Sequence, residues 1–148
     1  MTPVDQTHLY EPDDPAKYGT CLTAAVASVL DLDHDTVPHF AHPDRFTDKT
    51  HFALHEVDAV FQGLAPMNWI DALPVWARMM GWKAVWETVP EEVPDGYCVG
   101  SGDGPRGARH AVVCEMDGGV PTVVHDPHPS RDGLVGEPDG FWYFLPFD

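Results

Sequence analysis

The sequence predicts an α+β fold in which N-terminal helices pack on a C-terminal, mainly antiparallel sheet. Three observations support this prediction. Apolar residues recur at helical spacing in the first half of the chain, strand-like segments follow Gly81, and clusters of proline, glycine and aspartate separate those segments. The 148 residues are enough for one domain and too few for two ordinary ones, so we expect a single domain over residues 1–148.

The most clearly predicted helix begins near Thr20 and runs through TCLTAAVASVLDL. Thr20 is a suitable N-cap, and apolar residues follow it at positions 22, 25, 26, 29 and 30, which is the spacing of one helix face. Residues 33–51 contain two prolines and several histidines and are expected to form a loop. A second helix over residues 52–62 would end at Gly63.

A third helix has Asn68 as a candidate cap and ends at Gly81. Pro74 lies inside its pattern, so the helix is either kinked there or begins at about Leu73. After Gly81 the pattern changes to that of strands. Five strands are predicted, over residues 82–88, 96–100, 109–116, 120–125 and 141–145.

The composition limits the classes of partner. Hydrophobic residues make up 43% of the chain, which argues against disorder. With 24 acidic and 8 basic residues the net charge is −16, whereas nucleic acids and anionic membranes attract basic surfaces, so we expect neither partner. The acidity is consistent with solubility or a salt-rich setting, with a cationic substrate, or with an acidic decoy that imitates DNA.

Cysteine usage and the N-terminus predict a compartment. Cys21, Cys98 and Cys114 cannot all pair within the chain, and their spacing suggests no zinc knuckle, which is typical of a reducing environment. The N-terminus has acidic residues and prolines where a signal peptide would be basic and then apolar. No stretch approaches the roughly 18 apolar residues of a membrane span. We therefore expect a soluble cytoplasmic protein.

Cys21 begins the most clearly predicted helix and is a candidate nucleophile. A thiol attacks as the thiolate, which a helix N-terminus and a nearby imidazolium both favour. Gly19, just before it, would let a substrate or another backbone come close. The alternative is a small buried residue on an alanine-rich helix. Cys98 and Cys114 fall in predicted strands and are expected to be inert interior thiols.

The segment RHAVVCEMDGGVPTVVHDP predicts a hairpin that brings His110 opposite Asp126. The Asp-Gly-Gly sequence suits a three-residue loop, which would pair Met116 with Val120. Directly opposed residues have Cβ atoms about 4.5–5.5 Å apart, so the carboxylate would hold one ring nitrogen and leave the other for a thiol. A loop of even length would place the two side chains on opposite faces. The alternative is an ordinary polar pair near a strand end.

Cys21, His110 and Asp126 follow the chain order of a nucleophile, a base and an orienting acid. The segments YGTCLTAAVASVLDL, HAVV and VVHDPHP resemble the papain-like cysteine peptidase superfamily, in particular bacteriocin-leader-processing peptidase domains and small papain-like proteins encoded by bacteriophages. The resemblance covers about residues 18–31 and 104–146. It implies a papain-like fold, with Cys21 as nucleophile, His110 as general base and then acid, and Asp126 as the group that orients the imidazole.

The sequence departs from this pattern at the oxyanion hole. The peptidases that it resembles carry a glutamine six residues before the nucleophile, and Pro15 stands there instead. The backbone N–H of Cys21 can supply one donor, and Gln6 and Tyr18 are candidates for the second. Losing one donor typically costs about 10²–10³ in rate.

A glycine-rich loop, SGDGPRG at residues 101–107, runs into the predicted strand of His110. It either borders a substrate cleft or forms a surface turn, and it lacks the ending of a nucleotide-binding phosphate loop. The candidates for the substrate cleft are Gly19, Thr20, Ser101, Gly102, Gly107 and Arg109.

Two groups of histidines raise the possibility of a metal site. One comprises His39, His42, His51 and His55, and the other comprises His125 and His128 beside Asp126. Neither group matches a known ligand motif, because no glutamate completes HExxH and no cysteine joins them. We therefore expect no metal and no cofactor.

The sequence thus predicts a cysteine hydrolase that acts by acyl transfer on an amide, peptide or isopeptide bond of a peptide or protein, with a cationic substrate as one candidate. A thiol acyltransferase would use the same residues. The alternatives are a catalytically idle acidic binding protein or inhibitor on the same fold, and a histidine-ligated metal enzyme. The sequence leaves the oligomeric state open.

Overall fold

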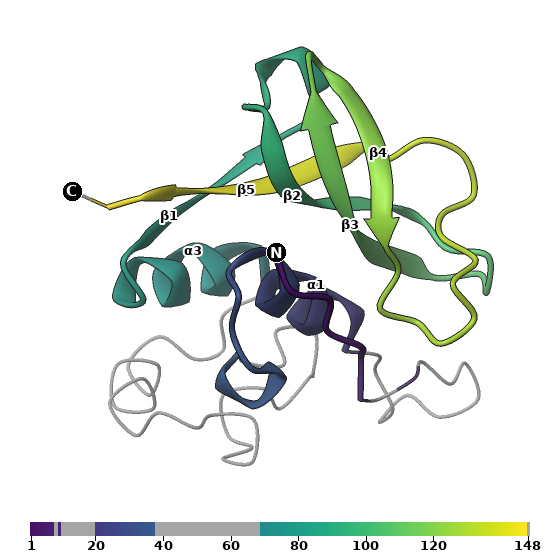
Figure 1. Cartoon of the computed structure of the whole chain (residues 1–148), viewed down its shortest axis with the longest axis horizontal. Coiled ribbons are helices and arrows are strands. Elements are labelled where there is room, and N and C mark those ends of the chain that lie inside the picture. Colours follow the sequence, from purple (N-terminus) through teal and green to yellow (C-terminus); the bar gives the residue numbers. More distant parts are fainter. Residues whose placement is uncertain (8, 10–19, 38–68, 148) are drawn as a thin grey trace.

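The computed structural model describes residues 1–7, 9, 20–37 and 69–147 of the chain. Within these described residues, two α-helices lie on one side of a five-stranded sheet (Figure 1). The helices are α1 (Cys21–Val29) and α3 (Trp69–Met79), with short 3₁₀ turns η1 (His34–Thr36) and η3 (Pro90–Glu92). The strands are β1 (Trp82–Glu87), β2 (Gly96–Asp103), β3 (Arg109–Asp117), β4 (Val120–His125) and β5 (Gly140–Pro146).

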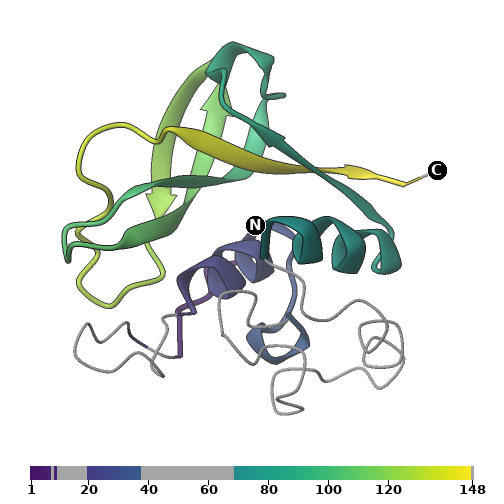
Figure 2. The ribbon, with the colours of Figure 1, turned by 180° about the vertical axis from the view of Figure 1, so that it is seen from behind.

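The sheet has the strand order β1-β5-β2-β3-β4, and every neighbouring pair is antiparallel. Helix α1 packs on β2 and β3, and α3 packs on β1. Seen from behind, both helices again lie along the same side of the sheet (Figure 2). The predicted α+β class and helix-on-sheet arrangement are therefore confirmed. In the described part of the chain, no helix is long and apolar enough to cross a membrane.

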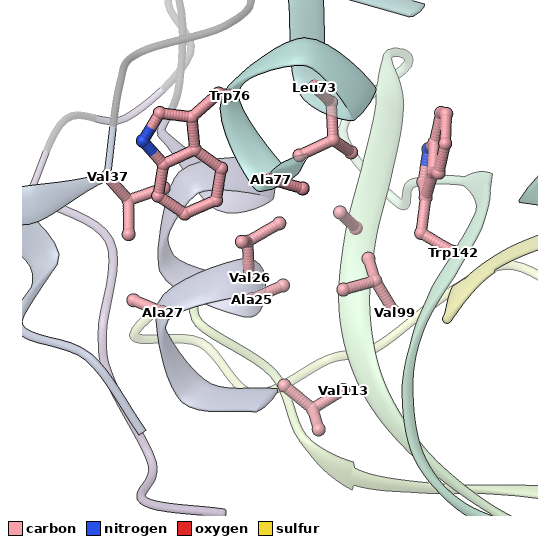
Figure 3. Close-up of a cluster of buried hydrophobic side chains, with 11 residues drawn as sticks. Ala25, Val26, Ala27, Val37, Leu73, Trp76, Ala77, Val99, Val113 and Trp142 are labelled. Atoms are coloured by element: carbon pink, nitrogen blue, oxygen red, sulfur yellow. The ribbon is translucent and has the colours of Figure 1, made fainter. Parts of the chain in front are cut away.

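The two faces of the sheet carry separate clusters of buried side chains, because residues along a strand alternate between faces. On the helix side, Val26 of α1 packs with Trp76 and Leu73 of α3 and with Val99 and Val113 of the sheet (Figure 3). Burying each such large side chain contributes roughly 1.5–3 kcal/mol. The opposite face buries Val93, Cys98, Val112, Cys114, Met116 and Phe141.

The helix predictions hold where the structure describes them. Helix α3 begins at Trp69 and continues through Pro74, so a start at Leu73 is wrong. Gly81 follows it with a φ of +89°, which supports its predicted role at the helix end. The predicted helix over residues 52–62 and the histidines at positions 39, 42, 51 and 55 lie outside the described residues.

The turn between β3 and β4 differs from the prediction. Gly118 and Gly119 both adopt positive φ, of 57° and 82°, and form a two-residue turn that pairs Asp117 with Val120. Because two glycines supply both left-handed positions, the chain reverses without the third loop residue. The predicted pairing of Met116 with Val120 is wrong, since Met116 pairs with Pro121.

A β-bulge shifts the register by one further residue in the same direction. Cys114 pairs with Val123, whereas Val113 pairs with His125, so Val124 is an extra residue on β4. Continuing this register by one residue places Asp126 opposite Val112, so the predicted position of Asp126 directly opposite His110 is wrong, although both side chains lie on the same face of β3. The even-length turn would have separated His110 from Asp126, and the bulge reunites them.

Candidate active site

A buried histidine and a buried aspartate form the centre of the site. His110 is 6% exposed and Asp126 is 4% exposed. His110 Nε2 lies 2.6 Å from Asp126 Oδ1, so the bond fixes one ring nitrogen and leaves Nδ1 for other chemistry. The predicted contact between these two residues is therefore present in the structure.

The Asp126 carboxylate accepts two further hydrogen bonds from the loop that follows it. The N–H of His128 donates to Oδ1 at 2.9 Å, and the N–H of Gly133 donates to Oδ2 at 2.7 Å. Burial acts to raise the pKa of Asp126, but the hydrogen bonds from His110, His128 and Gly133 outweigh it and hold that pKa below its usual value. Asp126 is thus an ionised acceptor that can orient the ring and stabilise a positive charge on it.

Cys21 is the first residue of α1, as predicted, and it is partly buried. Burial raises the pKa of its thiol, and the charge of Asp126 raises it further, while hydrogen bonds from backbone groups at Ala111 and Leu22 act in the opposite direction. The backbone groups at the helix start lower this pKa, as expected, but desolvation of the sulfur is the larger effect, so the net shift is upward. Cys21 is therefore a neutral thiol at pH 7.

The sulfur of Cys21 is close to the histidine strand. The Ala111 backbone group that influences its pKa belongs to the residue after His110, and the Asp126 charge reaches it as well. Between described residues, no hydrogen bond joins the Cys21 thiol to the His110 ring. Catalytic hydrogen bonds are often long without substrate and tighten when it binds.

Thr20 holds the start of α1 in a way that the sequence did not predict. It occupies the N-cap position, but its side chain makes no capping hydrogen bond. Its hydroxyl instead accepts the N–H of Thr7 at 2.9 Å. We call residues 4–7 the N-terminal strap, because this segment also joins the other half of the site.

The N-terminal strap is bonded to the end of β4 and the loop after it. The N–H of Gln6 donates to the Pro127 carbonyl at 3.0 Å, and His125 Nε2 lies 2.9 Å from the carbonyl of Val4. Gln6 is partly buried there, between the start of α1 and the Asp126 loop. Its role as a second oxyanion donor stays a prediction.

Arg131 connects the N-terminal strap to Asp126 through hydrogen bonds. Its guanidinium donates two hydrogen bonds to Asp5, at 2.6 and 2.9 Å, and a third to the backbone carbonyl of Asp126. The sequence did not predict the contact between Asp5 and Arg131, which are 126 residues apart, and no local pattern marks it.

The predicted cleft residues have mixed outcomes. Ser101 and Gly102 belong to β2 rather than to a loop, where they pair with Ala111 and His110. Gly107 lies in the β2–β3 turn. Arg109 donates two hydrogen bonds to Asp139, at 2.6 and 2.7 Å, so a carboxylate of the chain itself already occupies this guanidinium.

Other predicted residues make no contribution that the structure describes. Tyr18 and Gly19 lie outside the described residues. Elsewhere, within residues 1–7, 9, 20–37 and 69–147, no three histidine, cysteine or acidic side chains are arranged to hold a metal ion. His125 is bonded to Val4, and His128 Nδ1 is bonded to Ser130, so both rings already have partners within the chain.

The three cysteines are expected to differ in their reaction with iodoacetamide. Because the pKa of Cys21 lies above its ordinary value of 9.0, its alkylation is expected to be slow at pH 7 and to accelerate as the pH rises beyond 9. Burial raises the pKa of Cys98 and of Cys114 to about 12, so both remain unlabelled in the folded protein. Peptide mapping after timed labelling would measure this order. A Cys21 rate that levels off below pH 7 would contradict it.

The structure thus brings Cys21, His110 and Asp126 to one end of the sheet, beside the start of α1. In Figures 1 and 2 the loop after β4 and the turn between β2 and β3 lie at this same end. The arrangement offers a thiol, an imidazole with one nitrogen fixed by a carboxylate, and the first N–H groups of a helix. No protein-family model, curated protein or solved structure matches the chain.

Proposed function

We propose that this protein is a cysteine hydrolase of papain-like fold that cleaves an amide or peptide bond through an acyl-enzyme. The observation that carries the proposal is the buried 2.6 Å contact between His110 and Asp126, next to the helix start that bears Cys21. A histidine oriented in this way is suited to accept and return a proton. The resemblance of the Cys, His and Asp segments to papain-like peptidases supports the same assignment.

The proposed reaction begins from a neutral Cys21 thiol. As the sulfur attacks the substrate carbonyl, its proton passes to Nδ1 of His110, and Asp126 stabilises the imidazolium. The N–H of Cys21 and the side chain of Gln6 are the proposed donors to the oxyanion. His110 then gives its proton to the leaving amine as the carbon–nitrogen bond breaks. Water, deprotonated by His110, finally hydrolyses the thioester.

Acylation by p-nitrophenyl acetate tests this proposal without knowledge of the natural substrate. We expect release of p-nitrophenolate together with an acetyl thioester on Cys21, detected by intact mass and peptide mapping. Cys21→Ala should abolish the adduct, and His110→Ala should slow its formation by about 10²-fold or more, because general-base assistance is typically worth 10²–10⁴. Cys98→Ala, which removes a buried thiol that pairs across the sheet with Cys114 and not with His110, is the matched control and should leave the rate unchanged.

A catalytically idle binding protein is the second candidate function. The raised pKa of Cys21 and the lack of a described hydrogen bond between its thiol and His110 favour it. In that case Cys21 would acylate at the same rate in the wild type and in His110→Ala. Circular dichroism of both proteins would confirm that they are folded, so the equality would rule out the hydrolase.

A further inference from the structure

A second polar cluster lies next to the proposed catalytic histidine. The ring of His128 stands edge-on to that of His110, with centroids 6.3 Å apart. His128 Nδ1 accepts the N–H of Ser130 at 3.0 Å and lies 2.9 Å from the Ser130 hydroxyl. The same hydroxyl accepts a hydrogen bond from Arg106 at 3.2 Å. A continuous chain of contacts therefore connects Arg106 to His110.

These bonds determine which atoms of His128 can bind a ligand. A nitrogen that accepts a backbone N–H carries no proton, so His128 is in the neutral form with its proton on Nε2. Burial and the neighbouring Arg106 charge lower the pKa of His128, in agreement with that form. Its Nε2–H makes no hydrogen bond to any described residue and is available as a donor.

Arg106 differs from the two other arginines near the site. Arg109 binds Asp139 and Arg131 binds Asp5, each through two hydrogen bonds. In contrast, the Ser130 hydroxyl is the one hydrogen-bond partner of Arg106 among the described residues. In a chain with 24 acidic and 8 basic residues, an arginine without an acidic partner keeps its charge and most of its N–H donors for a ligand.

The cluster lies directly beside the proposed catalytic imidazole. The ring centroids of His110 and His128 are 6.3 Å apart, and the N–H of His128 donates to Oδ1 of Asp126, the same oxygen that contacts His110. A substrate that reaches His110 therefore comes close to His128 and, next to Ser130, to Arg106.

We propose that Arg106 and His128 bind a carboxylate of the substrate, so that the protein prefers substrates that carry a free carboxylate close to the scissile bond. The guanidinium and the imidazole Nε2–H supply charge-assisted hydrogen bonds of the kind that carboxylates form most strongly. This inference rests on the proposed hydrolase for the statement that the ligand is a substrate, but the carboxylate site itself does not require turnover. The net charge had suggested a cationic substrate. At physiological salt, charges beyond about 8 Å are screened. The nearby Arg106 therefore determines which ligand charge this site prefers, more than the net charge of the chain does.

A binding experiment on Cys21→Ala, which cannot turn over, tests the carboxylate site. The probes are N-acetyl-dialanine with a free C-terminal carboxylate and the same compound as its C-terminal amide, followed by NMR of the His128 ring. We expect the acid to shift the His128 resonances and raise the His128 pKa, and the amide to do neither. Arg106→Gln should weaken binding of the acid roughly 10- to 100-fold.

Two further variants make the result specific. Arg106→Lys keeps the charge but not the planar fork, and should recover part of the affinity. Lys83→Gln removes the same charge from β1 and should change nothing. Equal responses to acid and amide, or unchanged binding in Arg106→Gln, would overturn the proposal. Binding without His110-dependent acylation would identify a carboxylate site in a non-catalytic protein, and acylation without binding would leave the hydrolase standing and remove only this inference.

Discussion

Asp126→Ala is expected to destabilise the folded protein by about 3–5 kcal/mol and to remove the assistance that His110 gives to Cys21. The substitution leaves a buried imidazole and two backbone donors, His128 N–H and Gly133 N–H, without their acceptor. Removing one member of a buried polar pair costs about this much, because its partner stays desolvated. Urea unfolding at pH 7 measures the loss of stability, and acylation by p-nitrophenyl acetate measures the loss of reactivity.

Asp126→Asn keeps an acceptor for the imidazole and removes the charge. The amide has nearly the same shape and can still accept one N–H bond, so its loss of stability should be smaller than that of Asp126→Ala. Reactivity should also fall less than in Asp126→Ala, because an amide oxygen can orient the imidazole, as in Cys-His-Asn arrangements. The pKa of Asp126 is lowered on folding, so the ionised carboxylate stabilises the protein above its unfolded pKa, and this contribution is lost as pH falls through the folded pKa. Wild type and Asp126→Asn should therefore converge in stability in acid. An Asp126→Ala protein as stable and reactive as wild type would refute the assigned role.

Gly104→Ala is expected to displace His110 and to slow acylation of Cys21 by an order of magnitude or more. An added Cβ would lie 2.7 Å from the Ala108 carbonyl oxygen and 2.9 Å from His110 Cβ, and both are too close. The Gly104 N–H already binds that carbonyl at 2.8 Å, so the backbone of the β2–β3 turn must move. Overpacking of this kind costs about 1–3 kcal/mol, and small displacements of a catalytic group cost about 10²-fold in rate.

Gly100→Ala provides the matched control for Gly104→Ala. Its added Cβ would meet the Cys114 sulfur at 2.6 Å, within the buried cluster on the face of the sheet away from the helices. It should therefore destabilise the protein by a similar amount in urea. The folded Gly100→Ala protein should still acylate Cys21 normally. Equal loss of reactivity in the two variants would attribute the effect to general destabilisation.

The elements of the fold were predictable from the sequence because their signals are local. Alternation after Gly81 and the glycine and proline clusters placed all five strands, and the apolar spacing after Thr20 placed α1. These patterns report which residues are buried on each element. The main change is that β2 extends to Asp103, because pairing with β3 continues as far as Arg109.

The contact between His110 and Asp126 was predicted from an incorrect register. The turn has two residues instead of three, and the bulge at Val124 shifts the register by one more residue in the same direction, so Asp126 lies opposite Val112 instead of His110 but on the same face as His110. A bulge is set by how the sheet twists and packs, which no short window of sequence reveals. The raised pKa of Cys21 was likewise unpredictable, because desolvation depends on which distant residues cover the sulfur. The same reason explains why Asp5 and Arg131 were missed.

The N-terminal strap connects two parts of the molecule that the chain itself keeps far apart. The N–H of Thr7 is bonded to Thr20 at the start of α1, and the N–H of the adjacent Gln6 is bonded to Pro127. Two neighbouring backbone amides therefore connect the helix to the loop after β4. When this segment detaches, both amides become open to solvent deuterium in a single event. Their exchange rates therefore measure how often this segment detaches from both the start of α1 and the loop after Asp126, and the measurement needs no substrate.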